Sequence, residues 1–215
     1  MSGRPAHALI VANGKLPPNE AVRRLARRAD LVVCADGGAN RLRRYRVKPD
    51  VILGDLDSIS AATARYYRNT PTLKYSDQES TDLEKAIRFS IQVGIRSADV
   101  IGALGGRIDH TTGSLGCFKR FGDEIDLRFH GGGGVLTRIR KKATLGTRKG
   151  ETISLIPLDR CTGITTTNLK YPLDNDFLEP GVREGISNEA TGTSVTISVK
   201  HGTLLLLKFD SLRPE

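Results

Sequence analysis

The chain has 215 residues, of which 38% are hydrophobic and 27% charged, and its formal net charge is +9. Such a chain can bury a proper core, in one large domain or two small ones. No apolar run approaches the ~20 residues of a membrane span, the N-terminal apolar stretch is too short for a signal peptide, and the three cysteines form neither a zinc motif nor a disulfide framework. We therefore expect a cytoplasmic protein that does not contact a membrane.

The first part of the chain alternates apolar runs typical of strands with segments of helical periodicity. Strands are predicted at 7–12, 31–35, 50–53, 73–75, 99–103 and 125–129. Helices are predicted after Asn19, which is expected to cap the first one, and then after 36–40, at 61–68, after 81 and at 109–121. Thr81 and Glu84 match a capping box, and Gly94 matches a helix stop. This alternation predicts βαβ units with a mostly parallel sheet flanked by helices.

Nine of the basic residues fall between Arg23 and Lys48. Arg23 and Arg27 share one helical face, as do Arg24 and Arg28. Aromatic residues make up only 5% of the chain and there is no Trp, so a nucleic-acid platform built on base stacking is disfavoured. We interpret the basic run as a solvated helix surface, with electrostatic attraction of polyphosphate substrates as the alternative, and we expect no nucleic-acid partner.

The character of the sequence changes at the four glycines 131–134. Beyond them, turns rich in Gly, Asn, Asp and Pro separate short β-rich runs at 135–139, 152–157, 163–169, 194–200 and 203–209. Helical periodicity is absent, which is typical of an antiparallel sandwich or barrel. We expect the boundary between residues 130 and 135, with an α/β domain at 1–132 and a β-sandwich domain at 133–215.

Two acids follow the buried apolar run 51–53. Asp55 and Asp57 are one residue apart, at the carboxyl end of a predicted parallel strand, where ligands bind in such sheets. Two carboxylates this close repel each other unless a cation joins them, and hard oxygen ligands suit Mg²⁺. In the alternative interpretation, each acid only caps the backbone amides of a turn.

Other turns after predicted strands carry acids that would gather along the same edge. Together with the turn of Asp55 and Asp57, these turns supply six acids: Asp36, Asp55, Asp57, Asp77, Asp82 and Asp109. Arg107 is the only obvious counter-charge, so divalent metal and a polyphosphate would balance the charge. Singly, Asp82 and Asp109 could be helix N-terminal acids and Asp77 a loop acid. The motifs of P-loop enzymes and of dinucleotide-binding proteins are absent.

Seven segments, in a fixed order and spread over nearly the whole chain, carry a family resemblance. They are 35–40, 49–59, 77–85, 102–110, 154–158, 169–173 and 185–189. They include Asp-Gly-Gly, Gly-Asp-x-Asp, Asp-Gln, Thr-Asp, Arg-x-Asp and Ser-Asn motifs. In these motifs and their order the chain resembles the thiamine pyrophosphokinase (thiamine diphosphokinase) family.

The resemblance implies an N-terminal α/β domain and a C-terminal β-sandwich, assembled as a homodimer with sites at the subunit interface. The implied reaction uses ATP, thiamine and Mg²⁺ and gives AMP and thiamine diphosphate. By the family's pattern, the metal-binding and catalytic acids are Asp55, Asp57 and Asp82. The residues implied to bind nucleotide or thiamine are Asp36, Gly37, Gly38, Asp77, Gln78, Thr81, Arg107, Asp109, Tyr171, Ser187 and Asn188.

The permanent positive charge of thiamine suits an acidic pocket and an aromatic face. Sequence leaves open which of Asp55, Asp57 and Asp82 accepts the proton of the attacking alcohol. One departure from the family lies at 130–134, where His and four glycines replace an Asp-Glu-Asn-Asn-like turn. Two alternatives are a diphosphokinase for another alcohol, such as a hydroxymethylpterin, and a basic ligand-binding or nucleic-acid-binding protein that is not an enzyme.

Overall fold

The computed structural model describes residues 6–209, which form two compact units divided between Gly132 and Gly133. The first unit is a six-stranded parallel sheet in the order β6-β5-β1-β2-β3-β4. The strands are β1 (His7–Val11), β2 (Leu31–Ala35), β3 (Val51–Gly54), β4 (Thr72–Lys74), β5 (Ser97–Ile101) and β6 (Asp126–Gly131). All six were predicted, and the parallel α/β interpretation is confirmed.

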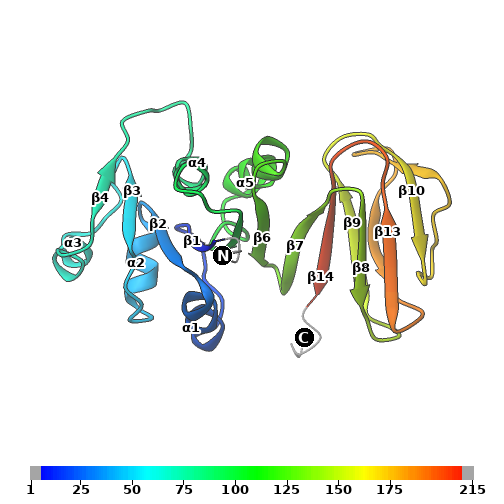
Figure 1. The fold of residues 1–215 in the computed structure, drawn as a ribbon, viewed down its shortest axis with the longest axis horizontal. Coiled ribbons are helices and arrows are strands. Elements are labelled where there is room, and N and C mark those ends of the chain that lie inside the picture. Colours follow the sequence, from blue (N-terminus) through cyan, green and yellow to red (C-terminus); the bar gives the residue numbers. More distant parts are fainter. Residues whose placement is uncertain (1–5, 210–215) are drawn as a thin grey trace, which may run out of the picture. The chain divides into compact units, whose positions relative to one another are not determined.

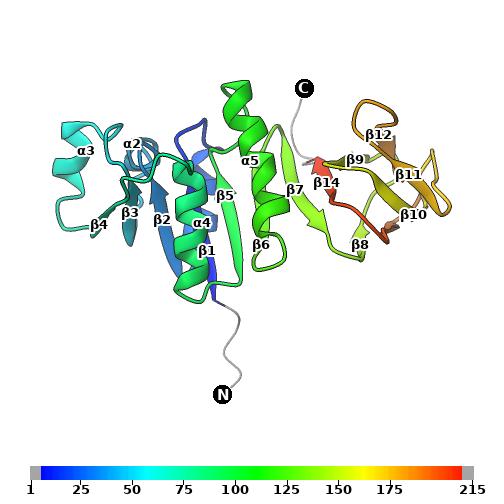
Figure 2. The ribbon, with the colours of Figure 1, turned by 90° about the horizontal axis from the view of Figure 1, so that it is seen from above.

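Five helices cover the two faces of this sheet (Figures 1 and 2). They are α1 (Asn19–Arg28), α2 (Gly38–Arg43), α3 (Ala61–Tyr66), α4 (Asp82–Gln92) and α5 (Ile108–Phe121). Helices α1 and α2 lie on one face, where Val22 and Leu42 join a core with Leu9 and Cys34. Helices α4 and α5 lie on the opposite face. Burial raises the pKa of the Cys34 thiol, which is consistent with an inert core residue.

The predicted N-cap of α1 is wrong, and the predicted N-cap of α4 is confirmed. The N-cap of α1 is Pro18, without a side-chain cap, and Asn19 is already helical. The Asn19 Oδ1 instead accepts a hydrogen bond from Arg23 Nε at 2.9 Å, so the cap prediction was wrong by one residue. Thr81 does cap α4, accepting from the Glu84 N–H at 3.3 Å. The Glu84 carboxylate pairs with Arg120 on α5 at 2.6 Å.

The second unit consists of two antiparallel sheets, in the orders β12-β9-β14-β7 and β11-β10-β13-β8. Its strands are β7 (Gly134–Ile139), β8 (Lys142–Gly146), β9 (Thr152–Pro157), β10 (Cys161–Thr167), β11 (Asp176–Leu178), β12 (Gly185–Glu189), β13 (Ser194–Ser198) and β14 (Leu204–Phe209). Both sheets contribute to one apolar cluster, with Leu155 and Leu204 from the first and Ile164 and Ile197 from the second. The β-sandwich interpretation is therefore confirmed.

The glycine run that departs from the family forms the turn between β6 and β7. Gly132 and Gly133 have φ of +60° and +85°, a region that favours glycine. The preceding His130 points back into the first unit, where its Nε2 lies 2.7 Å from Asp99 Oδ1. The two glycines therefore allow a tight reversal, and His130 contacts Asp99.

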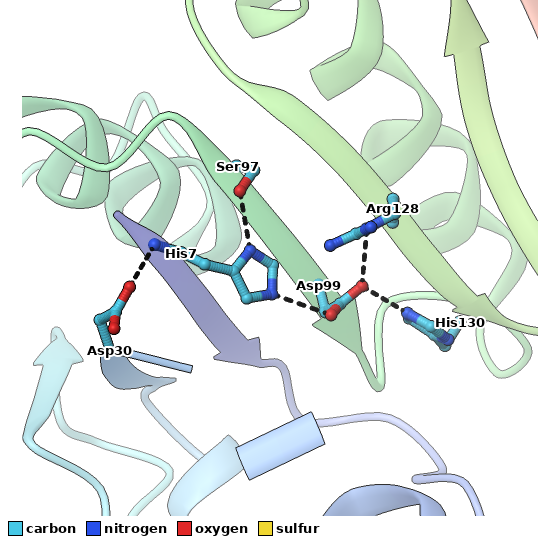
Figure 3. A network of polar contacts seen from close by, with 6 residues as sticks. All are labelled: His7, Asp30, Ser97, Asp99, Arg128 and His130. Carbon is cyan, nitrogen blue, oxygen red and sulfur yellow. Dashed lines mark hydrogen bonds and ion pairs between the residues drawn. The ribbon is translucent and has the colours of Figure 1, made fainter. Parts of the chain in front are cut away.

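Asp99 on β5 is the centre of a polar network (Figure 3). Its Oδ1 contacts His130 Nε2 and Arg128 Nε at 2.7 and 3.0 Å, and its Oδ2 contacts His7 Nε2 at 2.9 Å. The other ring nitrogen of His7 lies 2.8 Å from Ser97 Oγ. These contacts join β1, β5 and β6, and both ring nitrogens of His7 have partners.

Within residues 6–209, no helix combines the length and the apolar character that crossing a membrane requires.

Candidate active site

Asp36 begins the site at the carboxyl end of β2. Its backbone N–H donates to Leu53 O at 2.8 Å, and its φ of +41° is unusual for a residue with a side chain. The side chain is buried, and its Oδ1 has no hydrogen-bond partner within residues 6–209. Gly37 and Gly38 follow directly and begin α2. A buried carboxylate oxygen without a partner is costly and indicates a binding site for a ligand.

Asp55 and Asp57 follow β3 on a turn that bends sharply at Leu56, whose φ is +68°. The Asp57 N–H donates to Asp55 Oδ1 at 3.2 Å, and Ser58 Oγ donates to Asp57 Oδ1 at 3.0 Å. One carboxylate oxygen from each of Asp36, Asp55 and Asp57 lies within 4.8 Å of the other two. The turns after β2 and β3 therefore bring Asp36 together with two acids that lie later in the sequence.

The carboxylate of Asp82, the first residue of α4, also lies beside Asp36. A Cβ added to Gly54 would lie 2.8 Å from Asp36 Cβ and 3.0 Å from Asp82 Oδ1, so Gly54 separates these two acids. With a φ of +145°, position 54 requires glycine for conformation as well as for space. We call Asp36, Asp55, Asp57 and Asp82 the acidic cluster.

The charges within the acidic cluster affect one another. Burial raises the pKa of Asp82, and the negative charges of Asp36 and Asp55 raise it further. The ammonium of Lys85 opposes this, with its Nζ 3.3 Å from Asp82 Oδ1. Arg107 was the expected counter-charge, and the contact of Lys85 with Asp82 was not predicted. The i,i+3 spacing of these two residues on a predicted helix could have indicated this contact.

Arg107 instead pairs with Asp109 in its own turn. The two side chains, both exposed, approach to 2.6 Å, and this hydrogen bond holds the pKa of Asp109 at about 2. The N-cap of α5 is Arg107, so Asp109 is not the cap. Among the six predicted acids, Arg107 therefore contacts Asp109, while Lys85, which was not predicted, contacts Asp82.

The loop before α4 holds the remaining acid. Asp77 accepts hydrogen bonds from Ser80 Oγ and from the Glu79 N–H, and these bonds hold its pKa below its usual value. Its carboxylate is not one of the three that lie within 4.8 Å of each other. Asp77 therefore shapes its own loop. Gln78, beside it, is exposed.

Asn40 is a further residue of the site, and its role in the structure was not predicted. Its Nδ2 donates to Ser58 O at 2.7 Å, and its Oδ1 accepts from the Ser60 N–H at 3.1 Å. These two bonds tie α2, which follows Asp36, to the turn that carries Asp55 and Asp57. Asn40 was part of the predicted Asp-Gly-Gly-Ala-Asn turn. Its partner Ser58 lies 18 positions later in the chain, so the turn alone did not indicate this contact.

The predicted thiamine-binding residues lie in the second unit. Tyr171 is 63% exposed. The Asn188 side chain donates to Tyr171 O at 2.8 Å and accepts from the Tyr171 N–H at 3.1 Å. Ser187 has a φ of +56°, and its N–H donates to Ser154 Oγ at 3.0 Å. Asn188 therefore fixes the backbone of Tyr171, whose ring is exposed and lies beneath the ammonium of Lys170, with Nζ 5.8 Å from the ring centre.

A two-unit chain with an acidic cluster on a parallel sheet edge, followed by a β-sandwich, resembles solved structures of one class of transferase. The structure titled thiamin pyrophosphokinase from Candida albicans superimposes with a TM-score of 0.85 at 21% identity, covering 96% of this chain and 90% of that one. The structure of thiamine pyrophosphokinase from Bacillus subtilis gives 0.82 at 24% identity, covering 96% and 100%. At these identities the similarity establishes the fold.

Sequence comparison establishes the family. The model described as "Thiamin pyrophosphokinase, catalytic domain" matches residues 22–127, and "Thiamin pyrophosphokinase, vitamin B1 binding domain" matches residues 137–204. Thiamine pyrophosphokinase 1 of Oryza sativa subsp. japonica is 32% identical over an alignment of 222 positions, which covers 90% of this chain and 83% of the relative. The chain belongs to the thiamine pyrophosphokinase family.

Proposed function

We propose that this protein transfers a diphosphoryl group from ATP to the hydroxyethyl oxygen of thiamine, giving thiamine diphosphate and AMP. Membership of the family supports an ATP-dependent kinase of this kind. The observation that carries the proposal is the acidic cluster, in which turns that are distant in sequence meet around Gly54 and Asp36 Oδ1 has no hydrogen-bond partner among the described residues. Carboxylates gathered in this way suit a cation and a polyphosphate.

The acidic cluster fits a divalent cation, which we propose to be Mg²⁺. Its donors are hard carboxylate oxygens, and the buried Asp36 Oδ1 has no hydrogen-bond partner within residues 6–209. Asp55, Asp57 and Asp82 would hold the ion, and we propose Asp36 as a further ligand because its carboxylate lies beside those of Asp55 and Asp57. When bound, the ion supplies positive charge to phosphate oxygens that become more negative during transfer.

The residues of this chain would position the reactants and accept a proton. The thiamine hydroxyl oxygen forms a bond to the β-phosphorus of ATP, and the bond from that phosphorus to the oxygen of AMP breaks. A carboxylate of the acidic cluster accepts the hydroxyl proton, and AMP leaves with the bridging oxygen. Alignment of the hydroxyl with the leaving oxygen is the main contribution of the protein.

The other predicted residues would bind the two substrates around this cluster. We assign nucleotide binding to the residues of the turns after the strands, namely Gly37, Gly38, Asp77, Gln78, Thr81, Arg107 and Asp109. We assign thiamine binding to the exposed ring of Tyr171, which favours a cationic thiazolium, and to Ser187. Asn188 would hold the Tyr171 backbone.

We propose a homodimer in which the partner subunit supplies the thiamine-binding residues, as the family resemblance implies. Exposed Tyr171, Val182 and Ile186 in the second unit support an interface there. We also propose a cytoplasmic location. Within residues 6–209, Cys34, Cys117 and Cys161 form no disulfide, which agrees with a reducing compartment.

The direct test is release of AMP in reactions that contain ATP, Mg²⁺ and thiamine, with each component omitted in turn. AMP release that requires all three is expected. Thiamine should be preferred over a hydroxymethylpterin in competition, because the second unit carries the exposed Tyr171. AMP release that is independent of thiamine, or preference for the pterin, would contradict the proposed substrate.

A further inference from the structure

Lys85 is the one lysine or arginine that is buried among residues 6–209. It lies on α4 almost one turn after Asp82, with its Nζ 3.3 Å from Asp82 Oδ1. Its charge also helps to lower the pKa of Asp77 in the preceding loop. A buried ammonium is costly unless it is paired, so its place beside the acidic cluster needs an explanation.

We propose that Lys85 is a positioning residue that neutralises part of the acidic cluster while no metal is bound, and that Lys85 and the divalent cation oppose each other at the same carboxylates. The inference rests on the proposed function only in requiring that a divalent cation binds this cluster. It concerns the free protein and needs neither ATP nor thiamine.

The argument follows from charge. Four carboxylates held around Gly54 repel one another, and this repulsion destabilises the folded protein. One ammonium in contact with Asp82 offsets part of that repulsion and holds the Asp82 side chain towards the cluster. When a divalent cation binds, it neutralises the same acids, and the charge of Lys85 then repels it. Lys85 therefore stabilises the empty site and weakens cation binding.

This opposition also suits turnover. A cluster with an internal cation would hold a bound metal less tightly than a fully acidic cluster, which would favour release after the reaction.

The sequence offers two matched comparisons. Lys85→Arg keeps the charge, and Arg88→Met removes an exposed charge one turn further along α4.

The test is thermal unfolding of wild type, Lys85→Met, Lys85→Arg and Arg88→Met, in chelator and in saturating Mg²⁺. Lys85→Met should melt below wild type in chelator, and Mg²⁺ should remove most of that difference. Calorimetric titration with Mg²⁺ alone, at about pH 8 where carboxylates are ionised, should give a Kd about tenfold lower for Lys85→Met. The two control variants should respond to Mg²⁺ as wild type does.

The inference would be overturned if the Tm of Lys85→Met lay equally far below that of wild type with and without Mg²⁺, or if its Kd for Mg²⁺ were unchanged. Either result would leave the proposed metal site intact. A wild-type protein that does not bind Mg²⁺ would overturn the metal site itself. If Lys85→Met does not fold in chelator, the double variant Lys85→Met/Asp82→Asn should restore folding, because it removes the charge that Lys85 offsets. Failure of the double variant to fold would also overturn the inference.

Discussion

Two aspartates of the first unit are equally buried and have opposite surroundings. Asp36 is 4% exposed and Asp99 is 5% exposed. Both oxygens of Asp99 have partners, in His7, Arg128 and His130 (Figure 3). Asp36 Oδ1 has none within residues 6–209. Burial of a carboxylate is costly unless it is paired. We therefore interpret the paired Asp99 as a structural residue and Asp36 as a residue that binds a ligand.

The backbone supports the same distinction. Asp99 lies in regular pairing, opposite Leu9 on β1 and Arg128 on β6. Asp36 has a positive φ, as does Leu56 between the neighbouring acids. Strained conformations of this kind concentrate where function requires them. The comparison therefore predicts that activity depends on one aspartate and stability on the other.

The largest expected effect is on catalysis. Asp36→Asn and Asp55→Asn should each reduce kcat by about 100-fold or more, because each removes a charge that stabilises the transferring phosphates. The free energy of unfolding in chelator should be unchanged or increased, since repulsion is relieved. Steady-state AMP release and urea unfolding measure the two quantities. Full activity in both variants would contradict the metal assignment.

Asp99→Asn should show the reverse pattern. The substitution removes the charge that holds His130 and Arg128, and it should lower the free energy of unfolding by about 3 kcal/mol. The kcat of the folded fraction should stay within about twofold of wild type, since no contact joins Asp99 to the acidic cluster in the described chain. A loss of kcat with unchanged stability would reverse the roles assigned to Asp36 and Asp99.

The contribution of Asp99 should also depend on pH. Burial raises the pKa of Asp99, but the hydrogen bond from His130 and the charge of Arg128 outweigh it and leave the pKa below the ordinary 3.8. A carboxyl with a lowered pKa in the folded state contributes stability above its unfolded pKa and loses it as the pH falls through the folded value. The stability difference between wild type and Asp99→Asn should therefore shrink below 3.8. Urea unfolding measures it, and a difference that grows in acid would contradict the assigned partners.

Tyr171 extends the comparison to the second unit, because its exposed ring is available to a ligand. Tyr171→Ala should raise the KM for thiamine by about tenfold through loss of the aromatic face, with little change in the KM for ATP. Initial-rate kinetics with each substrate varied in turn measures this. Tyr171→Phe is the control, since it keeps the ring. An unchanged KM for thiamine in the alanine variant would remove Tyr171 from the site.

The smallest effect is expected at Thr81, whose hydroxyl already has a partner at the start of α4. Thr81→Ala removes the cap on the Glu84 N–H and should lower the free energy of unfolding by about 1 kcal/mol. Thr81→Ser keeps the cap and should behave as wild type in the same urea measurement. A much larger loss of activity than of stability would show that Thr81 also contacts substrate.

Local signals in the sequence predicted the strands and helices of the first unit and the acids of the cluster. Buried β-branched runs followed by Gly-Asp turns specify both the strand and its carboxyl end. The contact of Lys85 with Asp82 depends on which side of α4 is buried, which spacing alone does not settle. Asp99 and His7 are 92 positions apart, so only the tertiary fold brings them together.

The second unit was predicted less completely. Strands β8, β11 and β12 were not among the expected runs, because they are short or largely exposed and so carry a weak apolar alternation. β12 carries Ser187 and Asn188, which were placed by family motif alone. Their hydrogen-bond partners, Ser154 and Tyr171, lie on separate segments and were found only in the structure.

The most direct measurement is the position of a divalent ion in crystals grown with Mn²⁺ and a nucleotide, located by anomalous scattering. The account predicts one or more ions within ligand distance of Asp55 and Asp57, with the Asp36 Oδ1 oxygen no longer lacking a partner. An ion bound only elsewhere, with the nucleotide away from these carboxylates, would contradict it.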